Sequence, residues 1–321
     1  MKAMLVGAFD IGGTKTIVAL ADETGRLLEK EQFPTDTGSC RGHIETCCAV
    51  LRGLLAKRGL TAGQLGGVGV NLPGPVDRER GVLIRAVYAG WENIPAGAWI
   101  AELLGVENVA CENDVNSCAL GELRFGGGRR YASFGWMTVS TGVGGAVVCG
   151  GKLIRGAHGC AGEFGHIKVE YDAPRPCPCG ELGCLEAHGS GTALDRMIRE
   201  RAARDADFRR AFEDLGERPG GASCAELARN GNETARSLFH TLGRYLGRGI
   251  ACYVNILDPD AVFIGGGVAA SLDLLMPGIR GAVEEYTFAP MRNVEILPTA
   301  LGYEAALLGA VAIALQTGGA Q

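Results

Sequence analysis

The feature that most constrains the fold is a pattern of short apolar runs and glycine-rich turns that occurs twice in the chain. The first copy has apolar runs at 4–11, 16–21 and 27–33, and the second has them at 134–140, 146–149 and 153–154. Runs of β-forming residues joined by tight turns predict a three-stranded meander in each copy. An internal repeat of this kind predicts that the chain folds as two related halves.

Helices and further strands are expected to alternate after each meander. Helical segments are expected at 43–58, 98–104, 115–124, 192–215, 224–230 and 236–257, and strands at 65–71, 106–113, 261–264 and 294–297. The segments 192–215 and 224–230 are polar, so we expect these helices to be mostly exposed. The alternation predicts an α/β protein with a cleft between its halves, in which ligands bind beyond the carboxyl ends of strands.

Composition describes an ordinary globular protein and disfavours some classes of partner. Of 321 residues, 47% are hydrophobic and 21% are charged, and the formal net charge is −5. Such an acidic chain does not suit nucleic acid or an anionic membrane as its main partner. The apolar run 305–315 is too short to span a bilayer. Twelve cysteines without an opening signal peptide predict reduced thiols in the cytoplasm.

Three glycine-rich turns follow strand-like runs and are candidate phosphate sites. The first offers bare backbone amides beside a carboxylate and a lysine, in the residues Asp10, Gly12, Gly13, Thr14 and Lys15. Such a turn can hold phosphate oxygens, with the carboxylate near a magnesium ion. The other two turns contain Thr141, Gly142, Gly265 and Gly266. Each turn alone is more simply an ordinary hairpin, but three of them at strand ends favour a nucleotide cleft.

Asp114 lies where a strand-like run gives way to a helix. Asp is common as the N-cap of a helix, which would make this residue structural. A carboxylate at a cleft can instead act as the general base for an incoming hydroxyl group. The residues alone leave both interpretations open, and the two roles are compatible.

A cluster of His166, Cys177, Cys179 and Cys184 predicts a zinc site. Three thiolates and one imidazole complete a tetrahedral Cys3His shell, which is typical of structural zinc. Gly180 would let the chain turn tightly around the metal, as would Gly183. The alternative is a loop of reduced, partly buried thiols.

Glu163 and Glu186 flank this cluster. A carboxylate can accept hydrogen bonds from two adjacent sugar hydroxyls, so the pair predicts a polyol pocket that the metal holds in shape. The alternative is solvated surface charge.

Over nearly its whole length, the chain resembles the ROK family of sugar kinases and sugar-responsive repressors. This family has the actin-like ATPase (ribonuclease H-like) fold of actin, hexokinase and Hsp70. The resemblance rests on the motifs DIGGTK at 10–15, PGPVD at 73–77, ENDVNSCALGE at 112–122, STGVGGA at 140–146, GEFGH at 162–166, CPCGELGCLE at 177–186 and LDPDAVFIGGGV at 257–268.

The resemblance implies ATP-dependent phosphorylation of a hexose at its 6-hydroxyl, with glucose as the expected substrate. Asp114 matches the family's catalytic base. Residues that match its sugar-binding positions are Gly74, Asn113, Asp114, Glu163, His166 and Glu186. Residues at its ATP and magnesium positions are Asp10, Gly12, Gly13, Thr14, Thr141, Gly142 and Gly266, with Lys15 and Gly265 beside them. The four residues of the cysteine cluster match its zinc ligands.

The resemblance also implies a homodimer with two domains. The first is expected at 1–117, completed by a C-terminal helix at 304–321, and the second, with the zinc loop, at 118–303. The sequence departs from the family pattern at His188, which is expected to alter the edge of the sugar pocket.

Three other functions compete with a glucose kinase. A kinase for N-acetylmannosamine or N-acetylglucosamine would differ in pocket shape, which one sequence does not show. A sugar-responsive regulator would carry a DNA-binding segment ahead of Asp10, where this chain has nine residues. A zinc-dependent hydrolase is disfavoured because a Cys3His shell leaves no open position for water.

Overall fold

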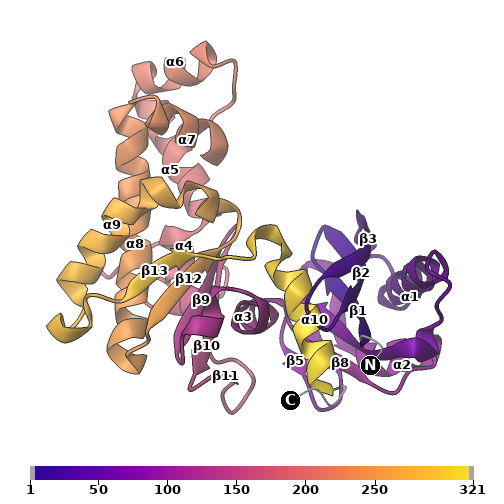
Figure 1. The fold of residues 1–321 in the computed structure, drawn as a ribbon. Helices are drawn as coiled ribbons and strands as arrows, with labels where there is room; N and C mark the ends of the chain where they lie inside the picture. The colour runs from indigo at the N-terminus through magenta and orange to yellow at the C-terminus, as the bar shows by residue number, and fades with distance from the viewer. Residues whose placement is uncertain (1–3, 318–321) are drawn as a thin grey trace. The chain divides into compact units, whose positions relative to one another are not determined.

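The computed structural model describes residues 4–317, which form two compact units (Figure 1). The first contains residues 4–132, 151–161 and 299–317, and the second contains residues 133–150 and 162–298. The units divide the chain at other residues than the expected 117/118 and 303/304. The difference arises because helix α3 (Asp114–Phe125) packs against helix α10 (Ala305–Thr317) within the first unit.

Five strands form the main sheet of the first unit, in the order β3-β2-β1-β4-β8. Their bounds are Leu5–Ile11 (β1), Lys15–Asp22 (β2), Leu27–Pro34 (β3), Leu65–Leu72 (β4) and Val109–Asn113 (β8). The first three form the expected antiparallel meander, and β1, β4 and β8 pair in parallel. β1 is central and mostly buried, which explains its nearly continuous apolar sequence.

Helices cover both faces of this sheet. α1 (Cys40–Ala56) and α2 (Ala96–Leu104) pack on one face, in a buried cluster that includes Phe9 and Val70. α10 packs on the other face, against the small side chains of Ala8 and Ala19. Figure 1 shows α1 and α10 on opposite sides of β1 and β2.

A second, smaller sheet of the first unit is not predicted by the apolar runs. It consists of Val76–Asp77 (β5), Val82–Ala86 (β6) and Trp91–Ile94 (β7), paired in antiparallel fashion. β5 has only two residues, and exposed charged side chains of β6 and β7, Arg85 and Glu92, form an ion pair. Such strands lack the apolar alternation that marks a half-buried strand.

The second unit repeats the strand arrangement of the first. β9 (Phe134–Val139) pairs antiparallel with β10 (Val143–Cys149) and parallel with β12 (Ala261–Gly265). β12 pairs in parallel with β13 (Glu295–Pro298). These strands correspond to β1, β2, β4 and β8, so the predicted duplication of an α/β half is confirmed. The strand after β10 in the chain is β11 (Lys152–Ile154).

The helices of the second unit differ in two ways from expectation. Their bounds are Leu185–Gly189 (α4), Gly191–Arg204 (α5), Ala206–Asp214 (α6), Gly221–Arg229 (α7), Glu233–Leu257 (α8) and Leu272–Tyr286 (α9). The single helix expected at 192–215 is two helices, because Asp205 caps a new one by accepting the Phe208 N–H at 3.0 Å. The expected exposure holds for charged residues such as Arg209 and Glu213, but these helices also bury an apolar face that includes Phe208, Phe212 and Cys224.

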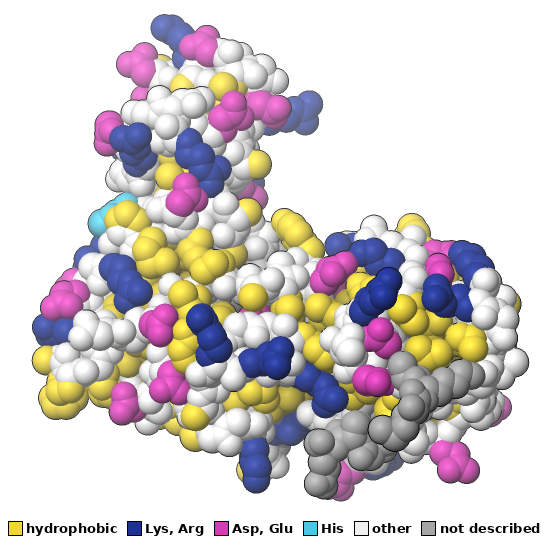
Figure 2. Space-filling view, in the orientation of Figure 1, with side chains coloured by type: hydrophobic (Ala, Val, Ile, Leu, Met, Phe, Trp, Pro, Cys, Tyr) yellow, Lys and Arg dark blue, Asp and Glu magenta, His cyan; other side chains and the backbone are white. Residues whose placement is uncertain are grey.

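Short 3-10 turns complete the structure, at Ala62–Gln64 (η1), Val87–Ala89 (η2), Gly127–Arg130 (η3), Phe164–His166 (η4), Gly267–Ser271 (η5), Ala289–Met291 (η6) and Gly302–Glu304 (η7). Figure 2 shows acidic and basic side chains interspersed on the face in view. None of the helices among residues 4–317 combines the length and the apolar character that crossing a bilayer requires.

Glycines bring α3, α10 and β4 into backbone contact. A Cβ atom on Gly309 of α10 would lie 2.1 Å from the carbonyl oxygen of Ser117 in α3. A Cβ atom on Gly69 of β4 would lie 1.8 Å from the carbonyl oxygen of Ala310. Neither position can hold a larger residue unless the backbone moves.

We expect Gly309→Ala to lower the free energy of unfolding by about 1–3 kcal/mol, because its methyl group cannot fit against Ser117. Alanine otherwise stabilises a helix relative to glycine by about 1 kcal/mol, so the sign of the change is the test. Gly53→Ala in α1 is the matched control and should be stabilising, because a Cβ atom there meets nothing within 4 Å. Urea unfolding measures both values, and a stabilised Gly309→Ala protein would contradict the close packing.

Candidate functional site

Asp114 is the first residue of α3 and directly follows β8. The N-cap of this helix is Asn113, whose side-chain oxygen accepts the N–H groups of Val115 and Asn116 at 3.0 and 3.2 Å. The N-cap role considered for Asp114 therefore belongs to its neighbour. Asp114 Oδ1 accepts the Val115 N–H at 2.9 Å and the Asn113 amide at 3.0 Å.

Three residues predicted to bind substrate lie close together where β8 ends and α3 begins. Besides its bond to Asp114, Asn113 Nδ2 donates to the carbonyl oxygen of Gly74 at 3.2 Å. A Cβ atom on Gly74 would lie 2.2 Å from the carbonyl oxygen of Arg85, so the loop needs glycine at this position. The structure thus brings together Gly74, Asn113 and Asp114, although 39 positions separate Gly74 from Asn113.

Asp10 and Asp114 form a pair of interacting carboxyl groups. Asp10 is the next-to-last residue of β1, in a half-buried position, where it accepts a hydrogen bond from Asn71 at 3.2 Å. Burial raises the pKa of Asp10. Burial and the negative charge of Asp10 together raise the pKa of Asp114 to about 6, against 3.8 for an ordinary aspartate. Two carboxylates at one place suit a divalent cation next to a general base.

The turn between β1 and β2 is tight and faces solvent. The Gly12 N–H donates to the carbonyl oxygen of Lys15 at 3.0 Å, so β2 begins at Lys15. Gly13, Thr14 and Lys15 are exposed, with Asp10 two residues before Gly12. The five residues predicted to hold phosphates and magnesium in the first half are therefore grouped at one end of the sheet.

Tyr88 also lies at this turn, although no sequence pattern pointed to it. Its hydroxyl is 3.5 Å from the carbonyl oxygen of Gly12, and its ring is 3.6 Å from where a Cβ atom on Gly13 would be. Burial and the nearby Asp114 carboxylate raise the pKa of Tyr88 to about 12. The hydroxyl is therefore a protonated hydrogen-bond donor at neutral pH. A single tyrosine in an irregular segment has no spacing from which its place could be predicted.

Glu112 is a second residue that sequence reasoning missed. Glu112 is only 3% exposed. One oxygen of its carboxylate, Oε2, accepts hydrogen bonds from both Nε and Nη2 of Arg155, each at 2.8 Å. The other oxygen accepts the Asn116 amide and the Asn113 N–H, each at 3.1 Å. This partly buried ion pair and the hydrogen bonds of Glu112 hold the start of α3, where Asp114 lies.

In the second unit, the glycine turns after β9 and β12 lie at neighbouring strand ends. Gly266 has a φ of 90°, and a Cβ atom on it would lie 2.4 Å from the carbonyl oxygen of Val139, the last residue of β9. Gly265 is the last residue of β12. The structure therefore groups four predicted residues, Thr141, Gly142, Gly265 and Gly266.

Glu186 of α4 reaches the turn after β9. Its Oε2 accepts the Val143 N–H at 3.0 Å. A Cβ atom on Gly142 would lie 2.3 Å from the same carboxylate oxygen, so a larger residue at position 142 would displace the Glu186 carboxylate.

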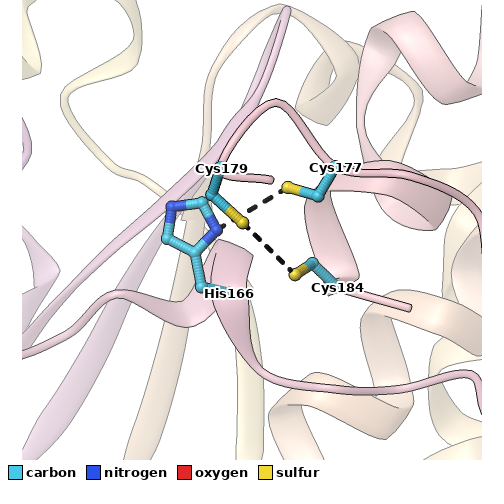
Figure 3. A group of neighbouring side chains, drawn as sticks. All are labelled: His166, Cys177, Cys179 and Cys184. Carbon is cyan, nitrogen blue, oxygen red and sulfur yellow. Dashed lines mark hydrogen bonds between the residues drawn. The ribbon is translucent and has the colours of Figure 1, made fainter. Parts of the chain in front are cut away.

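The four predicted metal ligands converge. The ligand atoms of His166, Cys177, Cys179 and Cys184 all lie within 4.8 Å of one another (Figure 3). The Cys179 and Cys184 sulfurs are 3.7 Å apart, and the Cys177 sulfur is 3.8 Å from His166 Nδ1. Zinc bonds of about 2.0–2.3 Å place tetrahedral ligands roughly 3.3–3.8 Å apart, so this donor set fits zinc.

The loop around the cluster is held by tight turns and by a buried histidine. Gly180 and Gly183 have φ angles of 94° and 75°, as expected for a chain that turns around a metal. His188 is buried, its ring centroid is 4.7 Å from that of Tyr245, and it accepts the Arg175 N–H at 3.1 Å. It therefore supports the segment before Cys177, and its expected effect on the edge of the sugar pocket stays a prediction. Glu163 is exposed and precedes the 3-10 turn that carries His166.

Comparisons with known proteins identify relatives over nearly the whole chain. The ROK family model matches residues 6–317. A glucokinase from Streptomyces coelicolor is 32% identical over 313 residues, covering 95% of this chain and 96% of that protein. The crystal structure of a ROK family glucokinase from Streptomyces griseus, in complex with glucose and AMPPNP, has a TM-score of 0.81 at 33% identity, covering 98% and 99% of the two chains. A ROK family transcriptional regulator, homologous to the Escherichia coli MLC protein, shares the fold with a TM-score of 0.87 at 23% identity, covering 98% of this chain and 78% of the regulator.

Asp114→Asn is expected to stabilise the free protein at neutral pH. Because the pKa of Asp114 is raised to about 6, ionising this carboxyl costs stability relative to the unfolded chain. The cost is absent below about pH 4, develops as the pH rises from about 4 to about 6, and reaches about 3 kcal/mol at neutral pH. Thermal unfolding should give similar stabilities for wild type and variant below about pH 4, and a more stable variant at neutral pH.

Asp22→Asn is a control of opposite sign. Hydrogen bonds from Thr24 and Arg26 hold the pKa of Asp22 below its ordinary value of 3.8. The ionised carboxylate therefore stabilises the fold above about pH 4, and this stabilisation is lost as acidification protonates the group. This variant should be less stable than wild type at neutral pH. A constant difference between wild type and Asp114→Asn across the whole pH range would contradict the raised pKa.

Proposed function

The chain belongs to the ROK family, and we propose that it transfers the terminal phosphoryl group of ATP to the 6-hydroxyl of glucose. It is an ATP-dependent hexose kinase with the actin-like ATPase fold. The observation that carries this conclusion is the full-length similarity, above 30% identity, to glucokinases, one of which was crystallised with glucose and AMPPNP.

We assign the role of general base to Asp114. Phosphoryl transfer depends mostly on positioning and on neutralising charge, while a carboxylate accepts the proton of the attacking hydroxyl. A pKa of about 6 leaves Asp114 ionised at neutral pH and makes it a stronger base than an ordinary aspartate. The amide of Asn113 and the N–H of Val115 both bond to Oδ1, so we assign the 6-hydroxyl to Oδ2.

We assign the nucleotide to the glycine turns that the sequence predicts as phosphate sites. Backbone amides can hold phosphate oxygens where no side chain obstructs them. The residues assigned to ATP are Gly12, Gly13, Thr14, Lys15, Thr141, Gly142, Gly265 and Gly266. Asp10, which accepts a hydrogen bond from Asn71, would hold a magnesium ion that neutralises phosphate charge.

The sugar is assigned to Gly74, Asn113, Glu163, His166 and Glu186 together with Asp114. His166 is also assigned to zinc, and its two ring nitrogens allow both roles. Nδ1 lies beside the thiol of Cys177, at 3.8 Å, so Nε2 is the nitrogen that we assign to a sugar hydroxyl. A zinc ion bound by His166, Cys177, Cys179 and Cys184 would then fix the imidazole toward the sugar. Because the shell is closed, zinc would be structural.

Steady-state kinetics with ATP and a panel of sugars test the proposal. We expect the highest kcat/KM for glucose among glucose, mannose, fructose, N-acetylmannosamine and N-acetylglucosamine. The variant Asp114→Asn tests the general base and should lower kcat by at least about 100-fold. Its affinity for glucose, measured by calorimetry, should change little. Near-normal turnover in this variant would remove Asp114 from the role of base.

Other outcomes of the panel would select the competing functions. A higher kcat/KM for an N-acetylated sugar would move the assignment to that kinase. Absence of turnover with every sugar would favour a sugar-responsive regulator. We also propose that the enzyme acts as a cytoplasmic homodimer, which light scattering of the purified protein tests for the oligomeric state.

Cys179→Ser is expected to raise the KM for glucose about tenfold by weakening the zinc shell that orients His166. The affinity for ATP should change little, because the turns assigned to the nucleotide do not include the cysteine loop. Elemental analysis should find one zinc ion per wild-type chain and less in the variant. Cys149→Ser is the matched control, since Cys149 is also exposed but lies outside the cluster. Unchanged glucose affinity in a folded, zinc-free protein would contradict this role.

A further inference from the structure

His43 is a buried polar residue that the proposed mechanism does not use. It lies in α1, is 2% exposed, and its ring centroid is 5.7 Å from that of Phe33 and 6.3 Å from that of Trp91. Its Nε2 is 2.8 Å from the hydroxyl oxygen of Thr16, a fully buried residue of β2. Burying such groups costs free energy unless their hydrogen bonds are made, so a satisfied polar network in an apolar core fixes one arrangement.

Two threonines connect His43 to the glycine turn after β1. The Thr16 hydroxyl oxygen is 2.9 Å from that of Thr35, and the Thr35 hydroxyl donates to the carbonyl oxygen of Gly12 at 2.8 Å. The Thr35 N–H also donates to the carbonyl oxygen of Thr14 at 3.1 Å. Thr35 therefore holds two carbonyl groups of the turn that we assign to the phosphates of ATP.

The direction of each hydrogen bond in this network follows from the donors available. A carbonyl only accepts, so the one proton of the Thr35 hydroxyl goes to Gly12, and the Thr35 oxygen accepts from Thr16. Thr16 has then used its proton and accepts from His43 Nε2–H. His43 Nδ1 accepts the Asp36 N–H at 3.3 Å. The ring is thus the neutral Nε2–H tautomer, and burial, which lowers the pKa of His43, favours this neutral form.

The bond from Thr35 to Gly12 also sets the direction of the next amide. In a planar trans peptide, the N–H of Gly13 points away from the carbonyl oxygen of Gly12. Since that oxygen faces Thr35, the Gly13 N–H is directed away from Thr35, at an exposed position of the turn.

We infer that His43 is a positioning residue for the nucleotide, which acts through Thr16 and Thr35 to aim the Gly13 N–H at a phosphate oxygen of ATP. The inference rests on the proposed kinase function. It assigns a role in nucleotide affinity to a residue of α1 that is connected to the turn at Gly12 only through two threonines and that we assign to neither substrate.

The test begins with His43→Phe, which keeps an aromatic ring in the core but removes both hydrogen bonds. The KM for ATP and the calorimetric dissociation constant of AMPPNP with magnesium should rise about tenfold, whereas kcat and the KM for glucose stay within about twofold. His43→Gln restores a donor toward Thr16 and should recover most of the affinity.

Thr35→Val probes the other end of the network and keeps the test valid if His43→Phe does not fold. It should raise the same two constants. The double variant should bind AMPPNP no more weakly than the weaker single variant, because both substitutions break one network. Cys47→Ala is the matched control, since Cys47 is buried in the same helix. It should lower the melting temperature and leave the AMPPNP affinity unchanged.

Two outcomes would overturn the inference. Unchanged AMPPNP affinity in the folded variants, in a protein that phosphorylates glucose, would refute the role of His43 and leave the kinase function standing. Equal rises in the KM values for ATP and glucose would show a general structural role instead. If the wild-type protein phosphorylates no sugar, the kinase function fails, and the AMPPNP dissociation constants still decide the role of His43.

Discussion

The position of Asp114 depends on the close contact between α3 and α10. α3 begins at Asp114, and Gly121 and Gly309 let its backbone approach that of α10. Near the other end of α3, the buried carboxylate of Glu122 accepts the Gly127 N–H at 2.7 Å and the Thr299 hydroxyl at 2.5 Å. Backbone packing therefore holds the helix that carries the Asp114 carboxylate. Rigid elements of this kind position functional groups more precisely than loops do.

The parts of the fold that could be predicted are those whose signal is local in the sequence. Apolar runs and glycine turns predict both meanders, because each strand pairs with its neighbour in the chain. The small sheet β5–β7 escaped prediction because its strands are short and carry exposed charged residues such as Arg85. The break at Asp205 was missed because a capping aspartate within a polar helical stretch looks like any other surface residue.

The same distinction applies to the candidate site. The cysteine cluster was predictable because its three thiols lie within eight residues, and the structure brings them together with His166. Tyr88 and His43 were not predictable, since Tyr88 meets Gly12 across 76 positions and His43 meets Thr16 across 27. Such contacts arise only when the sheet and its helices assemble, and one sequence carries no periodicity that records them.

The place of α10 in the chain has a consequence for how the protein is made on the ribosome. This helix covers one face of the first sheet, against Ala8 and Ala19, yet it follows every strand and helix of the second unit. Domains generally fold as units during synthesis. Here, the face of β1 and β2 that packs against α10 stays uncovered until α10 has been translated. The first unit is thus completed only after the second has been translated, so α3, which carries Asp114, gains its packing partner late. A chain that ends before α10 would have an incomplete core in the first unit.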